Sequence, residues 1–174
     1  MSGLDDDAAL AGELVRAAGR LAQRMRAAGL DSEQKTSVSD LVTAADTAAE
    51  RLVVERLRAE RPDDAIVGEE GTDHPGTSGR AWVIDPVDGT YNFVAGLPWW
   101  CSALALTDDG APVLGAVHHP ATDTLFVGGP DLPSTRDGVP LPPLADRPLG
   151  AVCATTYLHY PRATARTLAA FGRG

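Results

Sequence analysis

The sequence has few of the features that mark an exported or membrane-embedded protein. Cys101 and Cys153 are its only cysteines, too few for a disulfide framework, so we expect both to be reduced thiols in the core. No apolar run approaches the roughly 20 residues of a membrane span. The N-terminal segment MSGLDDDAAL carries aspartates where a signal peptide carries positive charge. These absences predict a cytoplasmic protein with no membrane partner.

Positive charge is scarce as well. The chain has 15 Lys and Arg against 24 Asp and Glu, a net charge of −9, and Lys35 is its only lysine. We expect no nucleic-acid partner, because a nucleic-acid backbone is bound mainly by basic side chains. The 174 residues are 44% hydrophobic and 22% charged, which predicts a globular chain of about one domain with a real core.

The N-terminal part of the chain predicts two helices. Apolar residues at three- and four-residue spacing predict the first over 7–28, with Gly29 at its end. The second is expected to begin at Thr43, which forms a capping-box pattern with Asp46, and to end before Pro62. The polar segment DSEQKTSVSDLV between them is expected to be irregular.

Short strands are predicted to follow the helices. The expected strands are AIVGEE (65–70), AWVID (81–85), two strands on either side of the turn 108–110, TLFVGG (124–129) and GAVCATT (150–156). The proline-rich segment 130–148 is expected to be a loop, and 162–171 a final helix. Two helices followed by mainly antiparallel strands predict an α+β fold with helices layered on a sheet.

Acidic residues cluster at the predicted strand ends and near a helix start. They are Asp46, then Glu69 with Glu70, then Asp85 with Asp88. Carboxylates without supporting His or Cys ligands suit Mg²⁺ or Mn²⁺ rather than zinc. The pattern therefore predicts a site for a hard divalent cation.

The segment DPVDGT adds a second element to this site. Because a proline fixes the direction of the chain as it leaves the strand, Asp85 and Asp88 can face one point together with the carbonyl of Val87. Converging carboxylates repel each other unless a cation lies between them. The N–H groups of Gly89 and Thr90 can hold a phosphate, especially if a helix begins there. A metal cluster beside a phosphate cradle is the minimum equipment for phosphoester hydrolysis.

Several of these features have a structural alternative. Asp-Pro and Asp-Gly are ordinary turn dipeptides, and Glu-Glu-Gly is compatible with a solvated strand end. His118 and His119 are adjacent in a predicted strand, so their side chains point to opposite faces and are not expected to share an ion. For Trp99 and Trp100 we expect packing in the core or an interface rather than a pocket.

The sequence resembles the inositol monophosphatase family of Mg²⁺-dependent, lithium-sensitive phosphatases. The resemblance runs through DLVTAADTAAE, IVGEE, WVIDPVDGTYNFVAGLP and GAVHHPATDTLFVG, in the family's order and approximate spacing. It implies the layered α/β sandwich of inositol monophosphatases and fructose-1,6-bisphosphatases, with only the N-terminal layer present here. It also implies a homodimer that acts on a small phosphorylated substrate.

The resemblance also implies roles for the acidic residues. Glu69, Asp85 and the Val87 carbonyl would hold a first Mg²⁺, and Asp85 and Asp88 would bridge to a second. An intact member would hold two or three ions at its site, and Mn²⁺ could replace Mg²⁺. Glu70 would support the surrounding water network.

Further roles concern the substrate. Gly89 and Thr90 would bind its phosphate, and Thr90 would pair with Asp46 to orient the attacking water. Lys35 matches a family lysine near the site.

One family feature is missing. Family members are longer, and their second half carries a Trp-Asp motif whose aspartate completes the second metal site; here the three tryptophans are followed by Val, Trp and Cys. We therefore expect a truncated member, with a metal- and phosphate-binding α+β domain over 1–150 and the start of a C-terminal α/β layer over 151–174.

The predicted function is hydrolysis of inositol monophosphate or a similar small alcohol phosphate by metal-activated water. Histidinol phosphatases share the DGT motif and are an alternative within the same family. A non-catalytic remnant retained for dimerisation or regulation is the alternative from another class.

Overall fold

A computed structural model describes residues 3–30, 38–69, 71, 73–146 and 148–151. The chain divides into two compact units, Met1–Leu141 and Pro142–Gly174. The helices and strands described below belong to the first unit, and a 3₁₀ turn, η1 (Leu149–Ala151), belongs to the second. The predicted domain division at residue 150 stays a prediction.

The first unit contains three helices and one sheet. The helices are α1 (Gly3–Leu30), α2 (Val38–Glu60) and the short α3 (Thr90–Val94). The strands are β1 (Ala65–Gly68), β2 (Arg80–Asp88), β3 (Cys101–Asp108), β4 (Ala111–His119), β5 (Thr124–Gly129), β6 (Leu132–Arg136) and β7 (Val139–Pro140).

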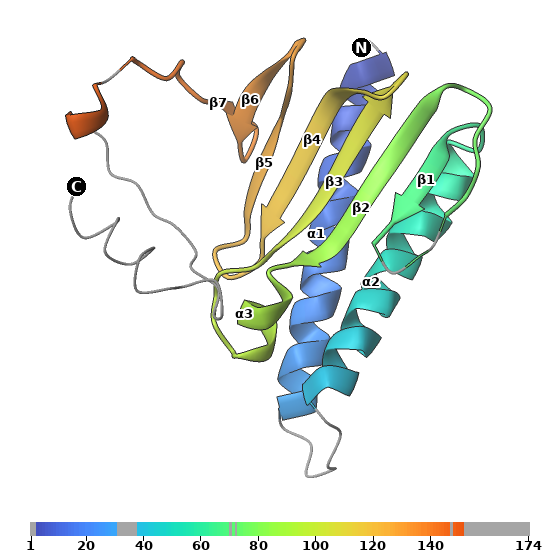
Figure 1. The fold of residues 1–174 in the computed structure, drawn as a ribbon, viewed down its shortest axis with the longest axis vertical. Coiled ribbons are helices and arrows are strands. Elements are labelled where there is room, and N and C mark those ends of the chain that lie inside the picture. The colour runs from blue at the N-terminus through green and yellow to red at the C-terminus, as the bar shows by residue number, and fades with distance from the viewer. Residues whose placement is uncertain (1–2, 31–37, 70, 72, 147, 152–174) are drawn as a thin grey trace, which may run out of the picture. The chain divides into compact units, whose positions relative to one another are not determined.

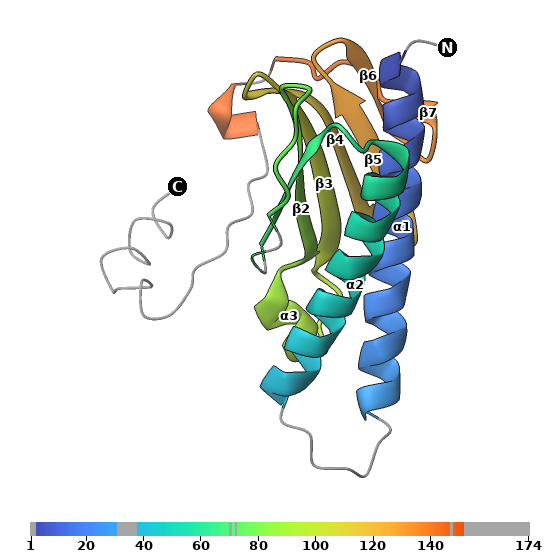
Figure 2. The same cartoon turned by 90° about the vertical axis from the view of Figure 1, so that its right-hand side faces the viewer.

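The two long helices lie side by side on one face of the sheet, as Figures 1 and 2 show. Their inward stripe consists of small and branched apolar residues at three- and four-residue spacing, which close packing of helix on sheet requires. From α1 these include Leu10, Leu14 and Ala18, and from α2 Ala49, Val53 and Leu57. No helix in the described part of the chain is long and apolar enough to cross a membrane.

Both helices are longer than the sequence predicts. α1 runs past Gly29, and α2 begins at Val38. The prediction that Thr43 caps this helix is therefore wrong, because Thr43 lies more than a turn inside it. Asp46 consequently sits in the helix interior, where its side chain is buried.

The sheet follows the order of the chain, β1 to β7. β1 pairs with β2 in parallel and every later pair is antiparallel, which confirms the predicted α+β class. The β3–β4 hairpin turns at Asp109 and Gly110, both with positive φ (47° and 80°), as a two-residue hairpin turn requires. The prediction of a loop over 130–148 is wrong in part, since β6 and β7 lie within it.

Side chains alternate between the two faces of this sheet. The face under the helices carries buried residues such as Trp82, Ile84 and Leu104. On the opposite face Val83 and Phe126 remain 43% and 40% exposed, and no other described element of the first unit covers it. The strand predicted over 150–156 begins instead with η1, and its remainder and the helix predicted over 162–171 lie outside the described residues.

Candidate metal centre

The end of β2 departs from regular strand geometry. The pairing with β3 shifts between Asp85 and Asp88, so that Pro86 and Val87 lie opposite the single residue Ser102. Pro86 and Val87 are both buried, while Asp85 is half-buried and Asp88 exposed. In a regular strand, residues three apart point to opposite faces. The extra residue of this β-bulge therefore brings Asp85 and Asp88 to the same face.

Further carboxylates approach Asp85 from neighbouring elements. The pKa of Asp85 is raised to about 7, mainly because the carboxyl group is buried. The charge of the Glu69 carboxylate, a hydrogen bond between the two groups, and the charges of Asp88 and Asp46 raise the pKa further. Glu69 follows β1, and Asp46 comes from α2, where it is 5% exposed. The fold thus gathers four of the predicted acidic residues around one point.

The loop after the bulge is shaped by Gly89. Its φ of 93° lies in the left-handed region, and a Cβ at this position would lie 3.0 Å from the carbonyl oxygen of Trp99. Only glycine meets both demands. α3 begins directly afterwards, and the Thr90 hydroxyl donates to the Val87 carbonyl at 3.2 Å. A short helix therefore begins directly after the DPVDG segment.

Two aromatic residues next to this loop, Phe93 and Trp100, pack against each other. Phe93 of α3 packs edge-on against Trp100, with ring centroids 4.9 Å apart, and the Arg26 guanidinium lies over both rings. Trp100 is buried as predicted, but Trp99 is 70% exposed. Core packing is therefore wrong for Trp99, which contributes its backbone carbonyl to Asn92 at 2.6 Å.

Three polar residues near the carboxylates were not among the predicted site residues. The Cys101 thiol lies 3.6 Å from an Asp88 oxygen; burial, then the Asp88 and Asp85 carboxylates, raise its pKa to about 12. This thiol is free, as predicted, but it is half-buried and beside a carboxylate, so the expected position in the core is wrong for it. Glu50 lies one turn after Asp46 and is 2% exposed. This one-turn spacing between the two acidic residues is visible in the sequence. No pattern in the sequence around Ser102 marks it as part of a site.

The donor set fits a hard divalent cation. One oxygen of Asp85, Oδ1, is buried and has no hydrogen-bond partner among the described residues, while the charges of Glu69, Asp88 and Asp46 all act on this carboxyl group. Such a group calls for a positive charge. The described carboxylates are not close enough to one another to form a complete ligand set. Within the described residues, which exclude Glu70, no three His, Cys, Asp or Glu side chains form a cluster that could hold a metal ion.

Other predicted residues stay untested. Lys35, Glu70 and Cys153 lie outside the described residues. The pairing of Thr90 with Asp46 stays a prediction, as do the individual metal and phosphate roles of Glu69, Asp85, Val87, Asp88 and Gly89.

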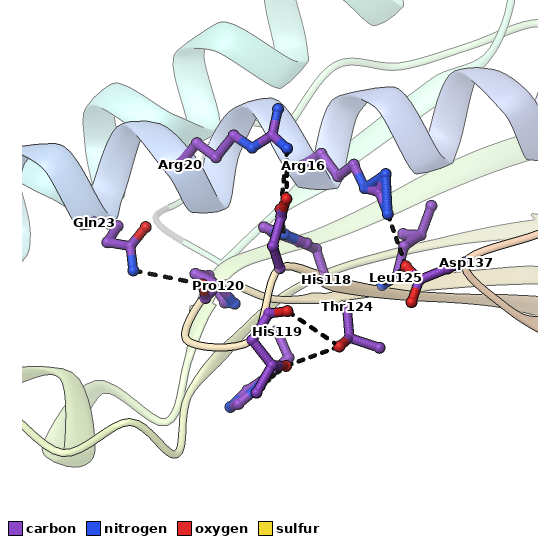
Figure 3. Close-up of polar contacts among 11 residues, drawn as sticks. Arg16, Arg20, Gln23, His118, His119, Pro120, Thr124, Leu125 and Asp137 are labelled. Atoms are coloured by element: carbon purple, nitrogen blue, oxygen red, sulfur yellow. Dashed lines mark hydrogen bonds and ion pairs between the residues drawn. The ribbon is translucent and has the colours of Figure 1, made fainter.

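The two histidines at the end of β4 have separate surroundings (Figure 3). His118 is fully buried beneath α1, and its Nε2 lies 2.9 Å from an Asp123 oxygen. Arg20 of α1 donates to the same carboxylate at 2.8 Å. His119 lies on the other face and bonds to the Pro98 carbonyl at 2.8 Å. The prediction that the two side chains point to opposite faces of the sheet is confirmed.

Comparisons with known proteins agree with the family resemblance of the sequence. A model of the inositol monophosphatase family matches residues 4–171. A fructose-1,6-bisphosphatase/inositol-1-monophosphatase of Thermotoga maritima is 45% identical over 95 residues, which are 54% of this chain and 36% of the relative. A histidinol-phosphatase of Mycobacterium tuberculosis is 44% identical over 118 residues, 67% of this chain and 45% of the relative.

The fold is also that of solved structures. An inositol monophosphatase from Zymomonas mobilis superposes with a TM-score of 0.66 at 35% identity, covering 81% of this chain and 54% of that one. The chain thus spans about half the length of the solved structure, and less than half of the two curated relatives.

Proposed function

Because the chain belongs to the inositol monophosphatase family, we propose that it supplies the metal- and phosphate-binding part of a Mg²⁺-dependent phosphomonoesterase. The observation that carries the proposal is the grouping of Glu69, Asp88 and Asp46 around Asp85, one oxygen of which has no partner among the described residues. Such a group is stable only with a proton or a cation in its midst.

The residues of this chain divide the work. Glu69, Asp85, Asp88 and the Val87 carbonyl would hold the ions, for which the bulge provides a common face. Bound Mg²⁺ or Mn²⁺ would lower the pKa of water and neutralise phosphate charge. The N–H groups of Gly89 and Thr90 would bind the substrate phosphate.

Proton handling falls to other side chains. Thr90 and Asp46 would orient the attacking water, and Glu70 would support the metal-bound water network. The buried side of Asp85 keeps water from that carboxylate, which strengthens its attraction for a cation. A locally positive site would then accept an anionic substrate on a chain of net charge −9.

The leading substrate is an inositol monophosphate or a similar small alcohol phosphate. Histidinol phosphate is the second candidate, favoured by the 44% identity to a histidinol-phosphatase. We also propose that the protein is a cytoplasmic homodimer. A non-catalytic role in dimerisation or regulation is the competing view.

Ion binding and turnover test the proposal separately. Mn²⁺ titration followed by electron paramagnetic resonance should show binding to the wild-type chain and its loss in Asp85→Asn. Asp137→Asn is the matched control, since this aspartate is engaged by Arg16 on the far side of the sheet. Phosphate release should then be measured with inositol 1-phosphate, histidinol phosphate and 3′-phosphoadenosine 5′-phosphate. Mn²⁺ binding that survives unchanged in Asp85→Asn would refute the site.

A further inference from the structure

The β2 bulge has a single partner residue across the strand pair. Ser102 is the one residue of β3 that lies opposite Pro86 and Val87. Its side chain is fully buried on the helix-facing side of the sheet, and its hydroxyl donates to the Pro86 carbonyl at 2.5 Å. A buried hydroxyl or carbonyl that lacks a hydrogen-bond partner destabilises the fold, and a bond between the two avoids that cost. The bond therefore fixes the peptide between Pro86 and Val87.

This peptide decides where the carboxylates point. Without an extra residue the strand would alternate regularly, and Asp88 would move to the face opposite Asp85. Proline has no N–H with which to hold the bulge through the ladder. The hydrogen bond from the Ser102 hydroxyl to the Pro86 carbonyl instead attaches the bulge to β3.

We propose that Ser102 is a positioning residue whose hydroxyl holds the β2 bulge and so keeps Asp85 and Asp88 on one face. Ser102 does not contact the cation or the substrate; it acts through the backbone of Pro86. The inference rests on the proposed function for its purpose, but the geometry that it explains does not depend on a bound ion.

The surroundings of Ser102 are closely packed. Its neighbour in register on β4 is the buried His118. From the helix side, a Cβ on Gly19 would lie 3.1 Å from the Ser102 oxygen and 2.6 Å from His118 Nδ1. α1 therefore lies directly over this point, and removal of the hydroxyl takes the Ser102 donor away from the buried Pro86 carbonyl.

The same strand pair offers a matched control. Thr107, at the other end of β3, donates its hydroxyl to the Ala81 carbonyl of β2 at 3.2 Å. Both bonds join a β3 side chain to a β2 carbonyl, but only that of Ser102 touches the bulge. Thr107→Val removes the control bond with nearly unchanged volume.

The first measurement is Mn²⁺ affinity of the full 174-residue chain. Ser102→Ala should weaken binding about tenfold, the usual lower range when a group that orients a metal ligand is removed, and Thr107→Val should leave it unchanged. Ser102→Cys keeps the volume with a weak donor and should resemble Ser102→Ala. Wild-type affinity in a folded Ser102→Cys or Ser102→Ala chain would overturn the proposal, because the hydroxyl would then be dispensable.

The second measurement needs no metal. In the metal-free protein, Asp85→Asn and Asp88→Asn should be coupled in a double-mutant cycle of urea unfolding, because the two charges repel each other on one face. That coupling should persist in Thr107→Val and collapse in Ser102→Cys. A coupling that survives in Ser102→Cys would overturn the proposal even if the wild-type chain bound no Mn²⁺. Absence of Mn²⁺ binding would count against the proposed function instead.

Discussion

At the scale of single residues, the fold brings several carboxylates close to Asp85. Asp85 shares its surroundings with Glu69, Asp88 and Asp46, although each carboxylate would be better solvated elsewhere. A site that destabilises the metal-free fold in this way is typical of groups selected for ligand binding. The charge at position 88 can be removed without emptying a core position, because Asp88 is exposed.

Asp88→Asn is therefore expected to leave the metal-free chain as stable as the wild type or more so. Its gain in stability from Mg²⁺ or Mn²⁺ should be mostly lost. A ligand at 100 times its Kd adds about 2.7 kcal/mol to the free energy of unfolding, and this is the scale of the shift that should disappear. Thermal unfolding with and without ion measures it. A metal response unchanged in Asp88→Asn would mean that these carboxylates are only turn residues.

His118 gives a prediction about pH. Burial and the charges of Arg16 and Arg20 lower its pKa from the ordinary value of 6.5, against an opposing effect of Asp123. The unfolded chain therefore takes up a proton near pH 6.5, and the folded chain only at lower pH. Stability from His118 is thus fully present above pH 6.5 and is lost as the pH falls through the folded pKa.

The measurement is the urea midpoint between pH 7.5 and pH 5. His118→Gln keeps a group near the Asp123 carboxylate but cannot titrate, so its midpoint should fall less than that of the wild type. His119→Gln is the control, because its ring lies outside the core. Equal acid sensitivity in the wild type and His118→Gln would contradict the prediction, because it would show that folding does not lower the pKa of His118.

At the scale of elements, α1 packs against the sheet at Gly19 with no room for a side chain. A Cβ there would meet His118 at 2.6 Å and Pro120 at 2.9 Å, whereas a Cβ on Gly3 of the same helix would meet nothing within 4 Å. Alanine favours a helix interior over glycine by about 1 kcal/mol, but overpacking a filled core costs about 1–3 kcal/mol. The two positions therefore separate propensity from packing.

We expect Gly19→Ala to destabilise the fold by up to about 2 kcal/mol, the net of these two effects. Gly3→Ala should be neutral or slightly stabilising. Chemical unfolding of both variants provides the comparison. If Gly19→Ala were the more stable of the two, α1 would have to stand farther from β4 than described here.

Elements whose determinants are local in sequence could be predicted. The helix stripes, the Asp109-Gly110 hairpin and the acidic residues of the site follow from periodicity and turn chemistry alone. The capping pattern at Thr43 was misleading because the helix continues through it. The strands within 130–148 were missed because they depend on pairing across the sheet, β6 with β5 and β7 with β6. The role of Ser102 could not be predicted, since its meaning depends on the register of β2 against β3.

At the scale of the whole molecule, the sheet face opposite the helices is the main surface without a described partner in the first unit. Val67, Val83 and Phe126 are between 40% and 43% exposed on it, and exposed apolar faces of this kind favour association. We therefore expect the chain to self-associate. Light scattering at tens of micromolar is the test, with Val83→Asp as the variant that should shift the mass toward a monomer. A clean wild-type monomer would contradict the expectation.

The last prediction concerns turnover by the 174-residue chain. By the family resemblance, the second metal ion and the leaving-group oxygen need an aspartate of a Trp-Asp pair, and this sequence has none. Loss of one arm of a two-metal clamp removes several kcal/mol of transition-state stabilisation, and each 1.4 kcal/mol is about a factor of ten in rate.

The chain alone should therefore release phosphate from inositol 1-phosphate at least ~1000-fold more slowly than a complete relative, by the same arithmetic. Mn²⁺ binding should persist, because Glu69, Asp85 and Val87 are all present. The assay compares the chain alone with the chain supplied in trans with the C-terminal half of a relative, and an Asp85→Asn chain in both arms controls for turnover by the added half. Near-normal turnover by the chain alone would show that one set of carboxylates suffices, and the division of labour between the two metal ions would have to be abandoned.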